Sequence, residues 1–566
     1  MLFGILLLKK LLHFWKKLTS MKRSRCSLVL ATLATFILSA NAQQTGYPQQ
    51  LFSRAEKSLY LETTSSSEVE EFISVLAKTS NLVTVETFGK SLEGKPLILV
   101  IMAKPRISTP QEAIASGKPV IYIQGNIHAG EVEGKEASMQ IMREIAFGPK
   151  QHLLDNQILL FCPNYNPDGN DKLGENRPSQ DGSPKLTGVR QSGEGFDLNR
   201  EGMKLEALES KALVNNVFNR WDPILFVDLH TDNGSWHGYA VNVAPSFTSI
   251  GSPQLLQYTK DMITSTADRI LERSGMPVWW HGYMRMGNNS PAIFTAYDHH
   301  PRYITNYFGL RNRMGILSET FAHQHFEKRI WSNYLLIHNL LEYTNGHAAE
   351  MSALVEEADR ISRELISGQS ANPEMGIRYE LTKEADTVRI LVRETVPYTD
   401  ERGRRRVRGT GQTYWKDSVL HYNAFVPTRM TRVPRGYFIP ANCTGAVEKL
   451  REHGIVLTPV NKRIRTEADR FVITEVRQSE REAYGGHKTV MLEGSFSMSK
   501  QNIGAGSWYV DLLQPLAWVA FYLLEPESDD GLAHWNYLDE QILGKDYSTG
   551  KVFYPILKVY SEPQLD

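Results

Sequence analysis

The chain has 566 residues, of which 41% are hydrophobic and 22% are charged, and its formal net charge is zero. This composition is ordinary for a globular protein, so it excludes general disorder, and the length permits several domains around a substantial core. A nucleic-acid-binding protein is normally basic, so the charge balance disfavours that class of function.

The first 42 residues are predicted to be an export signal. Two lysine pairs and the basic segment that starts at Met21 precede an apolar run at 27–39, and the small-x-small tripeptide Ala-Asn-Ala follows at 40–42. This order of basic, apolar and cleavage regions is typical of a secretory signal peptide. We expect translation to start at Met21 and the mature chain to begin near Gln43. An uncut membrane anchor is the alternative, although the apolar run is shorter than the roughly 20 residues that a span needs.

Removal of this segment makes the remaining chain acidic. The segment holds seven Lys or Arg and no Asp or Glu, so 56 basic and 63 acidic residues remain, a net charge of −7. The arginine-rich run at 402–408 is a local exception that we interpret as a solvated loop. Cys162 and Cys443 are the cysteines left in the mature sequence, which does not suggest a disulfide framework.

Apolar runs that alternate with amphipathic segments occupy the first two thirds of the chain. They predict strands at 82–88, 96–103, 119–124, 157–162, 223–229 and 313–318, and helices at 69–79, 136–145, 205–218, 255–271 and 326–343. The stretch 171–195 lacks periodicity and is expected to be a long loop, of the kind that often carries function. Strands alternating with helices indicate an α/β fold with a mainly parallel sheet.

The composition shifts near 367–373, after a predicted helix at 351–366. Beyond this point strands are expected at 377–392, 414–425 and 471–476, and a helix at 444–453. We therefore predict a larger α/β domain at 43–371 and a smaller C-terminal α+β domain at 372–566, with the boundary placed to within tens of residues.

Chemically competent side chains stand at the ends of three predicted strands. His128-Ala-Gly-Glu131 follows the third strand, His230 ends the fifth, and Glu319 ends the sixth. Ligands of α/β proteins bind at the carboxyl ends of strands. Two histidines and one glutamate form a catalytic zinc set with a position open for water, and a nearby carboxylate serves as general base. Each residue alone also fits an ordinary surface or core position, but their convergence on one edge is harder to obtain by chance.

A further motif lies in the predicted long loop and just beyond it. Asp197, Asn199 and Arg200 stand together, and Arg190 precedes Asn199 by nine residues. An arginine grips a carboxylate with two parallel hydrogen bonds and also stabilises an oxyanion. An aspartate such as Asp197 holds a metal-binding imidazole by its second nitrogen.

The order of these motifs resembles that of the zinc carboxypeptidase A-like family. His-x-x-Glu131, Pro-Asn-x-Asn-Pro-Asp-Gly169, Asp-Leu-Asn-Arg200, Asp-Leu-His230 and Ser-Glu319 follow one another as in that family, over roughly residues 83–343. The resemblance implies an α/β/α sandwich around a mixed, mainly parallel sheet. It also implies a zinc-dependent enzyme.

The resemblance assigns a role to each residue of the motifs. It implies that one zinc ion is bound by His128, Glu131 and His230, and that Asp197 supports His128. It also implies that Glu319 is the general base and acid and that Arg190 polarises the scissile carbonyl. Asn199 and Arg200 would bind the terminal carboxylate of the substrate. Arg177 competes with Arg190 for its role, and the nine-residue spacing favours Arg190. The family's substrate-capping tyrosine is assigned to Tyr307, with Tyr303 as the alternative. The remaining histidines of this region match no ligand position.

The implied function is that of a secreted or periplasmic metallocarboxypeptidase, which hydrolyses C-terminal peptide bonds by metal-activated water. Its partner would be the C-terminus of a peptide or protein, with no nucleic acid and no membrane span after signal cleavage. A rival keeps the zinc site and acts as an amidase or deacylase, or on cell-wall peptides. A second rival is a non-catalytic binding protein, which the complete set of His128, Glu131, His230, Arg190 and Glu319 argues against.

Overall fold

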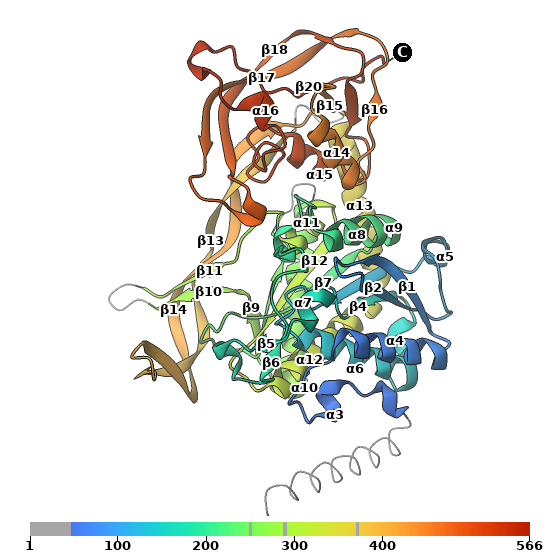
Figure 1. The fold of residues 1–566 in the computed structure, drawn as a ribbon, viewed down its shortest axis with the longest axis vertical. Coiled ribbons are helices and arrows are strands. Elements are labelled where there is room, and N and C mark those ends of the chain that lie inside the picture. The colour runs from blue at the N-terminus through green and yellow to red at the C-terminus, as the bar shows by residue number, and fades with distance from the viewer. Residues whose placement is uncertain (1–46, 248–251, 287–290, 369–372, 566) are drawn as a thin grey trace, which may run out of the picture.

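The structure is a computed structural model that describes residues 47–247, 252–286, 291–368 and 373–565 (Figure 1). The predicted signal at 1–42 and the expected mature terminus at Gln43 lie outside the described residues. Among the residues that are described, no helix has both the length and the apolar character needed to cross a membrane.

An eight-stranded mixed sheet forms the centre of the first two thirds of the chain. Its spatial order is β1 (Val83–Lys90), β2 (Pro96–Met102), β4 (Ile158–Cys162), β3 (Val120–Gly125), β7 (Leu225–Thr231), β12 (Met314–Thr320), β8 (Val241–Pro245) and β9 (Val278–Trp280). The four central strands β4, β3, β7 and β12 run parallel. The predicted mainly parallel α/β sheet is thus confirmed, and the six predicted strands are all present.

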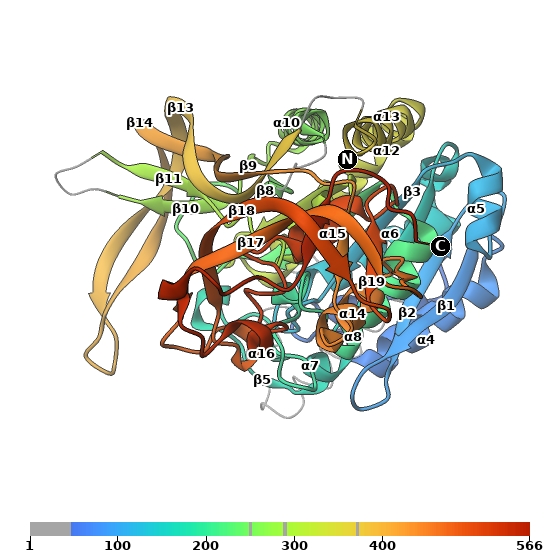
Figure 2. The same ribbon diagram turned by 90° about the horizontal axis from the view of Figure 1, so that it is seen from above.

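Helices cover both faces of this sheet (Figures 1 and 2). One face carries α4 (Ser66–Thr79), α6 (Glu133–Phe147), α10 (Pro253–Ser274), α12 (Phe326–Gly346) and α13 (Ala348–Ile366). The other carries α8 (Leu208–Leu213), a π-helical turn (Val214–Phe218), α9 (Asn219–Trp221) and α11 (Ile304–Leu310). Each face buries its own hydrophobic cluster, as expected for an α/β/α sandwich.

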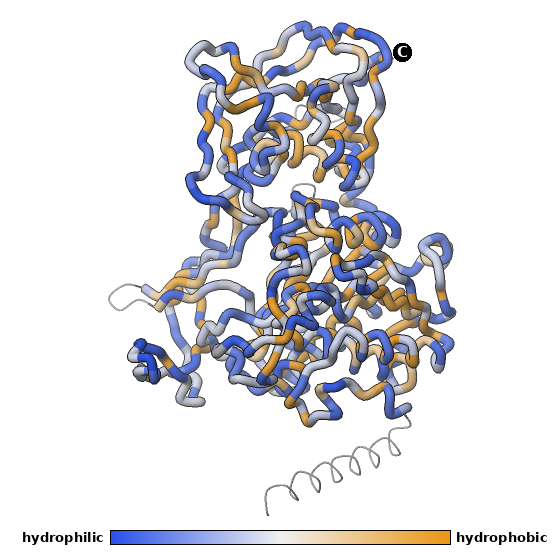
Figure 3. Tube along the Cα trace, viewed as in Figure 1, coloured by the Kyte–Doolittle hydropathy of each residue, from blue (hydrophilic) through white to orange (hydrophobic). Residues whose placement is uncertain are grey.

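A long hairpin begins the C-terminal third and returns to the first part of the chain. It consists of β13 (Glu374–Thr399) and β14 (Arg405–Arg432), and β14 pairs in parallel with β11 (Ile293–Ala296), which pairs with β10 (Gly282–Arg285). Residues before and after 372 therefore share one four-stranded sheet. The arginine run at 402–408 lies exposed at the hydrophilic tip of the hairpin (Figure 3), as expected, but only its first part is a loop, because β14 begins at Arg405.

The rest of the C-terminal third is a six-stranded sheet with short helices. The strands lie in the order β16 (Thr458–Pro459), β19 (Trp508–Asp511), β15 (Gly436–Ile439), β20 (Leu557–Val559), β17 (Ile464–Gln478) and β18 (Val490–Ile503), and the helices are α14 (Thr444–Glu452), α15 (Ala517–Leu524) and α16 (Asp539–Ile542). This region sits above the α8–α11 face in Figure 1, and Trp518 and Phe521 share one hydrophobic cluster with Tyr307 and Phe308. The predicted domain limits at 371 and 372 remain a prediction.

Candidate active site

The candidate residues gather where β3, β7 and β12 end. These strands are neighbours, and Glu319 on β12 lies directly opposite His230 on β7 in the register. The chain leaves β3 at Gly125, where an added Cβ would come within 2.9 Å of the Lys135 backbone nitrogen, so the close approach requires glycine. The turn that follows closes with a hydrogen bond from the Glu131 N–H to the His128 carbonyl at 2.9 Å. Side chains far apart in sequence thus meet at one edge.

The three candidate metal ligands form a compact, buried cluster. Donor atoms of His128, Glu131 and His230 all lie within 4.8 Å of one another. Nδ1 of His128 is 3.2 Å from one Glu131 oxygen, and Nδ1 of His230 is 3.0 Å from the other. Burial alone would raise the pKa of Glu131, but the two histidines hold that pKa well below its usual range. The glutamate is therefore an anion between two imidazole nitrogens.

A carboxylate holds the second nitrogen of each histidine. Nε2 of His128 is 3.0 Å from Asp197 Oδ1, and Nε2 of His230 is 2.9 Å from Asp228 Oδ2. Such contacts fix the tautomer and leave the other nitrogen, Nδ1, to bind a metal. Two imidazoles and one carboxylate with fixed orientation fit zinc in their donor chemistry. Asp228 was not assigned this role from the sequence, although the Asp-x-His spacing on one strand face carried the signal.

Glu319 lies beside this cluster with one oxygen unsatisfied. Its Oε2 is buried without a hydrogen-bond partner, and its Oε1 is 3.8 Å from Nε2 of His281. Burial raises the pKa of Glu319 to about 8, which the charge of His230 only partly offsets. Burial also lowers the pKa of His281 to about 4, so that imidazole is neutral. A cation bound nearby would lower the pKa of Glu319 and favour the ionised carboxylate.

Both candidate arginines reach the cluster. Arg190 donates two hydrogen bonds to Asp197 Oδ2, at 3.0 and 2.9 Å, and its Nη1 lies 3.1 Å from Nδ1 of His128. Its Nη1 is also 3.6 Å from Glu131, and Nη1 of Arg177 is 3.7 Å from the same oxygen. The structure therefore brings both guanidinium groups to Glu131, and the choice of Arg190 over Arg177 still rests on spacing.

Arg200 is held by aromatic rings rather than by an acid. Its guanidinium lies 4.0 Å from the ring centre of Tyr303 and 5.0 Å from that of Tyr484, and Nη1 donates to the Asn199 carbonyl at 2.7 Å. Among the described residues, no carboxylate forms a salt bridge with Arg200, so its charge is available to a ligand. Asn199 uses its side-chain oxygen to accept from the Ile304 N–H at 3.1 Å, at the start of α11.

The structure does not bring Tyr307 to the cluster. Tyr307 is fully buried in the core, and its hydroxyl lies 2.9 Å from Nδ1 of His453 in the C-terminal third. Its ring packs in the hydrophobic cluster shared with the C-terminal third, which sequence spacing alone did not reveal. Tyr303, the alternative, lies over Arg200. Tyr283 on β10 is 52% exposed and close enough to Glu319 for its charge to raise the tyrosine pKa further, beyond the effect of burial. Nothing in the sequence pattern singled out Tyr283.

A second imidazole–carboxylate group lies in the loop between β11 and α11. Asp298, His299 and His300 place their donor atoms within 4.8 Å of one another. His300 contacts Asp298, and Nε2 of His299 is 3.3 Å from Asp529 in the C-terminal third. Each of these histidines has an acidic partner, so we interpret the group as an ion-pair network.

Comparisons with known proteins point to one family. Residues 69–222 match the profile of the family described as zinc carboxypeptidase. The chain is 23% identical over 519 residues to carboxypeptidase 2 of Trichophyton tonsurans, which covers 88% of this chain and 86% of that protein. It is 31% identical over 140 residues to carboxypeptidase Z of Gallus gallus, covering 23% and 20% respectively. A solved metallo-carboxypeptidase from Burkholderia cenocepacia gives a TM-score of 0.39 at 18% identity, covering 51% of this chain and 71% of that one.

The matched segment contains the His128–Glu131 turn and the Asp197–Arg200 motif, and the match to carboxypeptidase 2 extends over most of both chains. These are the motifs whose order resembled the family in the sequence. Over residues 69–222 the chain therefore matches the zinc carboxypeptidase family of peptide hydrolases.

Proposed function

We propose that this protein is an exported zinc-dependent carboxypeptidase that removes residues from the C-terminus of peptides. The observation that carries the proposal is the orientation of His128 and His230. Both turn Nδ1 toward Glu131 while acids hold both Nε2 atoms. That arrangement supports a metal bound by His128, Glu131 and His230. A bound zinc ion would supply Lewis acidity to the attacking water and to the scissile carbonyl.

The other side chains would carry out the remaining steps. Glu319 takes a proton from the attacking water and then delivers it to the leaving amine, so that one water is consumed for each peptide bond cleaved. Arg190 donates to the carbonyl oxygen as negative charge develops on it. Arg200, which lacks an acidic partner among the described residues, pairs with the free carboxylate of the substrate. Asp197 holds His128 in position.

The rival functions make different demands on this site. An amidase, a deacylase or a cell-wall peptide hydrolase could use the same metal and base, but Arg200 favours a substrate that ends in a carboxylate. A non-catalytic binding protein would have no need for a buried Glu319 beside the ligand cluster. Export is supported by the basic, apolar and cleavage regions at 1–42.

Metal analysis of the purified protein tests the central claim. We expect one zinc per chain after zinc loading and dialysis, and its loss in His128→Ala and His230→Ala. His152→Ala is the matched control, because His152 lies on the surface, where its Nε2 is 2.9 Å from Glu342. Retention of one zinc by His230→Ala would refute the assignment. Two zinc ions per chain would indicate a second metal site, for which Asp298, His299 and His300 are the candidate ligands.

Peptide hydrolysis tests the direction of attack. Zinc-loaded protein should release the last residue of a peptide with a free C-terminus and leave the C-terminally amidated peptide intact. Equal cleavage of both peptides would contradict a carboxypeptidase and favour an amidase or endopeptidase at the same site.

A further inference from the structure

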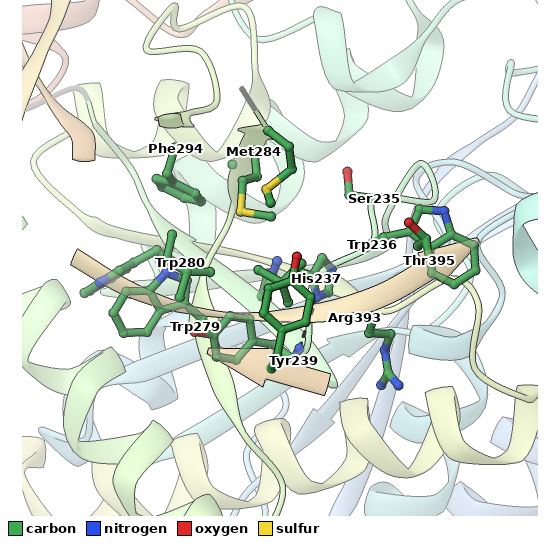
Figure 4. Close-up of a pocket in the computed structure, with 16 residues that line it drawn as sticks. Ser235, Trp236, His237, Tyr239, Trp279, Trp280, Met284, Phe294, Arg393 and Thr395 are labelled. Atoms are coloured by element: carbon green, nitrogen blue, oxygen red, sulfur yellow. Dashed lines mark hydrogen bonds between the residues drawn. The ribbon is translucent and has the colours of Figure 1, made fainter. Parts of the chain in front are cut away.

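An aromatic pocket lies at the edge of the central sheet, outside the ligand cluster. It has a volume of about 490 Å³, within the ~300–1,000 Å³ that is usual for small-molecule sites. Its walls come from the edge strands β8 and β9, from β10 and β11, and from the hairpin β13–β14 (Figure 4). The aromatic side chains that line it are Trp236, Tyr239, Trp279, Trp280, Phe294 and Tyr414.

The register of the sheet places this pocket next to Glu319. Glu319 pairs with His230 on one side and with Asn242 on the other, and Asn242 pairs with Trp279. Directly paired residues point to the same face of a sheet, and neighbouring strands are about 4.8 Å apart. One row of side chains thus leads from the ligand cluster through Glu319 to two pocket residues, one and two strands away. The pocket wall therefore begins one strand away from Glu319.

Two polar atoms in the pocket wall lack partners. The side-chain oxygen of Asn242 and the indole nitrogen of Trp279 are both buried without a hydrogen-bond partner among the described residues. A buried polar group without a partner costs roughly 1–3 kcal/mol. Both atoms lie within the wall rather than on its open surface, so the lining that a ligand meets is mainly aromatic.

One lining residue, Arg393, is a cation without a counter-ion in the described part of the chain. Among the described residues, Arg393 forms no salt bridge. Its guanidinium lies 4.3 Å from the ring centre of Phe321, and Phe321 follows Glu319 by two residues in the sequence. Burial lowers the pKa of Arg393, and its Nε lacks a hydrogen-bond partner. Arg389, four residues earlier on β13, instead pairs with Asp417 at 3.0 Å. An anionic group on a ligand in the pocket would act as the counter-ion of Arg393.

The hairpin wall is fixed in place by backbone contacts. The Gly238 N–H donates to the Leu391 carbonyl at 2.8 Å, and the Arg393 N–H donates to the Trp236 carbonyl at 3.2 Å. A Cβ at Gly238 would lie 2.3 Å from the side chain of Leu391, so this approach needs a glycine. The hairpin is attached to the loop that follows the His230 strand, which makes the pocket a built part of the site.

We propose that this pocket binds an aromatic side chain of the peptide substrate, with an adjacent acidic side chain paired to Arg393. The proposal deepens the carboxypeptidase function and rests on it for the identity of the ligand as a peptide. The aromatic walls supply stacking surface, the paired row places the pocket wall one strand away from Glu319, and Arg393 supplies the charge complement. The substrate class is a peptide in which an aromatic residue neighbours an acid close to the C-terminus.

Binding to the metal-free protein tests this pocket without hydrolysis. Calorimetry on chelator-treated protein would compare the dipeptides Phe-Glu, Phe-Gln and Ala-Glu, all of which present the same terminal carboxylate to Arg200. We expect Phe-Glu to bind about tenfold more tightly than either of the others. Trp279→Ala should abolish the preference for Phe over Ala, and Arg393→Met the preference for Glu over Gln.

Matched variants provide the controls. Trp331 on α12 is 52% exposed and stacks on Tyr334. Trp331→Ala and Arg389→Met should therefore leave both preferences intact. Trp279→Phe should retain the aromatic preference, which keeps the test open if the alanine variant does not fold.

Three outcomes would overturn the proposal. They are equal affinity for the three dipeptides, a loss of the preference for Phe in Trp331→Ala as large as in Trp279→Ala, and tighter binding of an N-acetylglucosamine disaccharide than of Phe-Glu. Failure of the carboxypeptidase function is a separate result. It would appear as no hydrolysis of any free-acid peptide by the zinc-loaded protein, while the dipeptide affinities stayed as measured.

Discussion

At the scale of single residues, the environment of Glu319 decides what this carboxyl group can do. Its Oε2 is buried without a hydrogen-bond partner, its Oε1 is 3.8 Å from Nε2 of His281, and the residue pairs with His230 on the neighbouring strand. We expect Glu319→Gln to keep the zinc content and the thermal stability of the wild type and to lower kcat by about 10²- to 10⁴-fold. Zinc analysis, thermal unfolding and peptide hydrolysis on the same preparation measure these quantities. A variant with near-normal kcat would remove Glu319 from the mechanism.

The two arginines should fail in different ways. Arg190 reaches the ligand cluster, whereas Arg200 lies between Tyr303 and Tyr484 without an acidic partner among the described residues. Loss of a contact that is made mainly in the transition state lowers kcat. Loss of a contact that binds the ground state and the transition state equally raises KM. We therefore expect Arg190→Ala to lower mainly kcat and Arg200→Ala to raise mainly KM.

Steady-state kinetics with a free-acid peptide separate the two effects, and amidation of that peptide should mimic Arg200→Ala in the wild type. Arg177→Ala is the matched comparison, since Arg177 also lies 3.7 Å from Glu131. A larger fall in kcat for Arg177→Ala than for Arg190→Ala would transfer the carbonyl-polarising role to Arg177.

At the scale of secondary-structure elements, a buried ion pair ties α12 to α6. Arg329 is fully buried, its Nε donates to Glu133 at 2.6 Å, and its Nη1 donates to the carbonyls of Gln180 and Ala322, each at 3.0 Å. Removal of one partner leaves the other as an uncompensated buried charge, which costs about 3–5 kcal/mol.

We therefore expect Arg329→Met to reduce the free energy of unfolding by that amount, as measured by denaturant titration. Arg360→Met is the control, because Arg360 on α13 is exposed and pairs with Glu357 on the surface. The double variant Arg329→Met with Glu133→Gln should recover part of the loss, since no charge is then left unpaired. Equal stability of Arg329→Met and Arg360→Met would show that the buried pair contributes little.

Elements whose pattern is local were predictable, and those that depend on distant pairing were not. The six strands and the helices at 69–79, 255–271 and 326–343 follow from hydrophobic periodicity, and the strand ends that carry His128, His230 and Glu319 follow with them. Strands β8 to β11 lie in a turn-rich stretch and are stabilised by partners elsewhere, such as Glu319 for Asn242. Sequence spacing also could not tell which face of α11 carries Tyr307.

At the scale of the whole molecule, the two predicted domains share a hydrophobic cluster and a sheet. Tyr307 and Phe308 pack in one cluster with Trp518 and Phe521, and β14 pairs with β11. Units joined through a common core unfold together. We expect calorimetry of the mature chain to show one cooperative transition, with the calorimetric enthalpy equal to the van't Hoff enthalpy. Two resolved transitions would instead support the domain limits predicted at 371 and 372.

The contact between Tyr307 and His453 has a consequence for the order in which the protein acquires its structure. His453 lies between the Tyr307 hydroxyl, 2.9 Å away, and the Met203 carbonyl, 3.1 Å away, across sequence separations of 146 and 250 residues. During synthesis the residues of α8 and α11 are made long before His453 and the segment around it. Contacts of such long range slow folding. The N-terminal part of the chain therefore leaves the ribosome with an apolar face still open, which the segment from α14 to α15 covers only later.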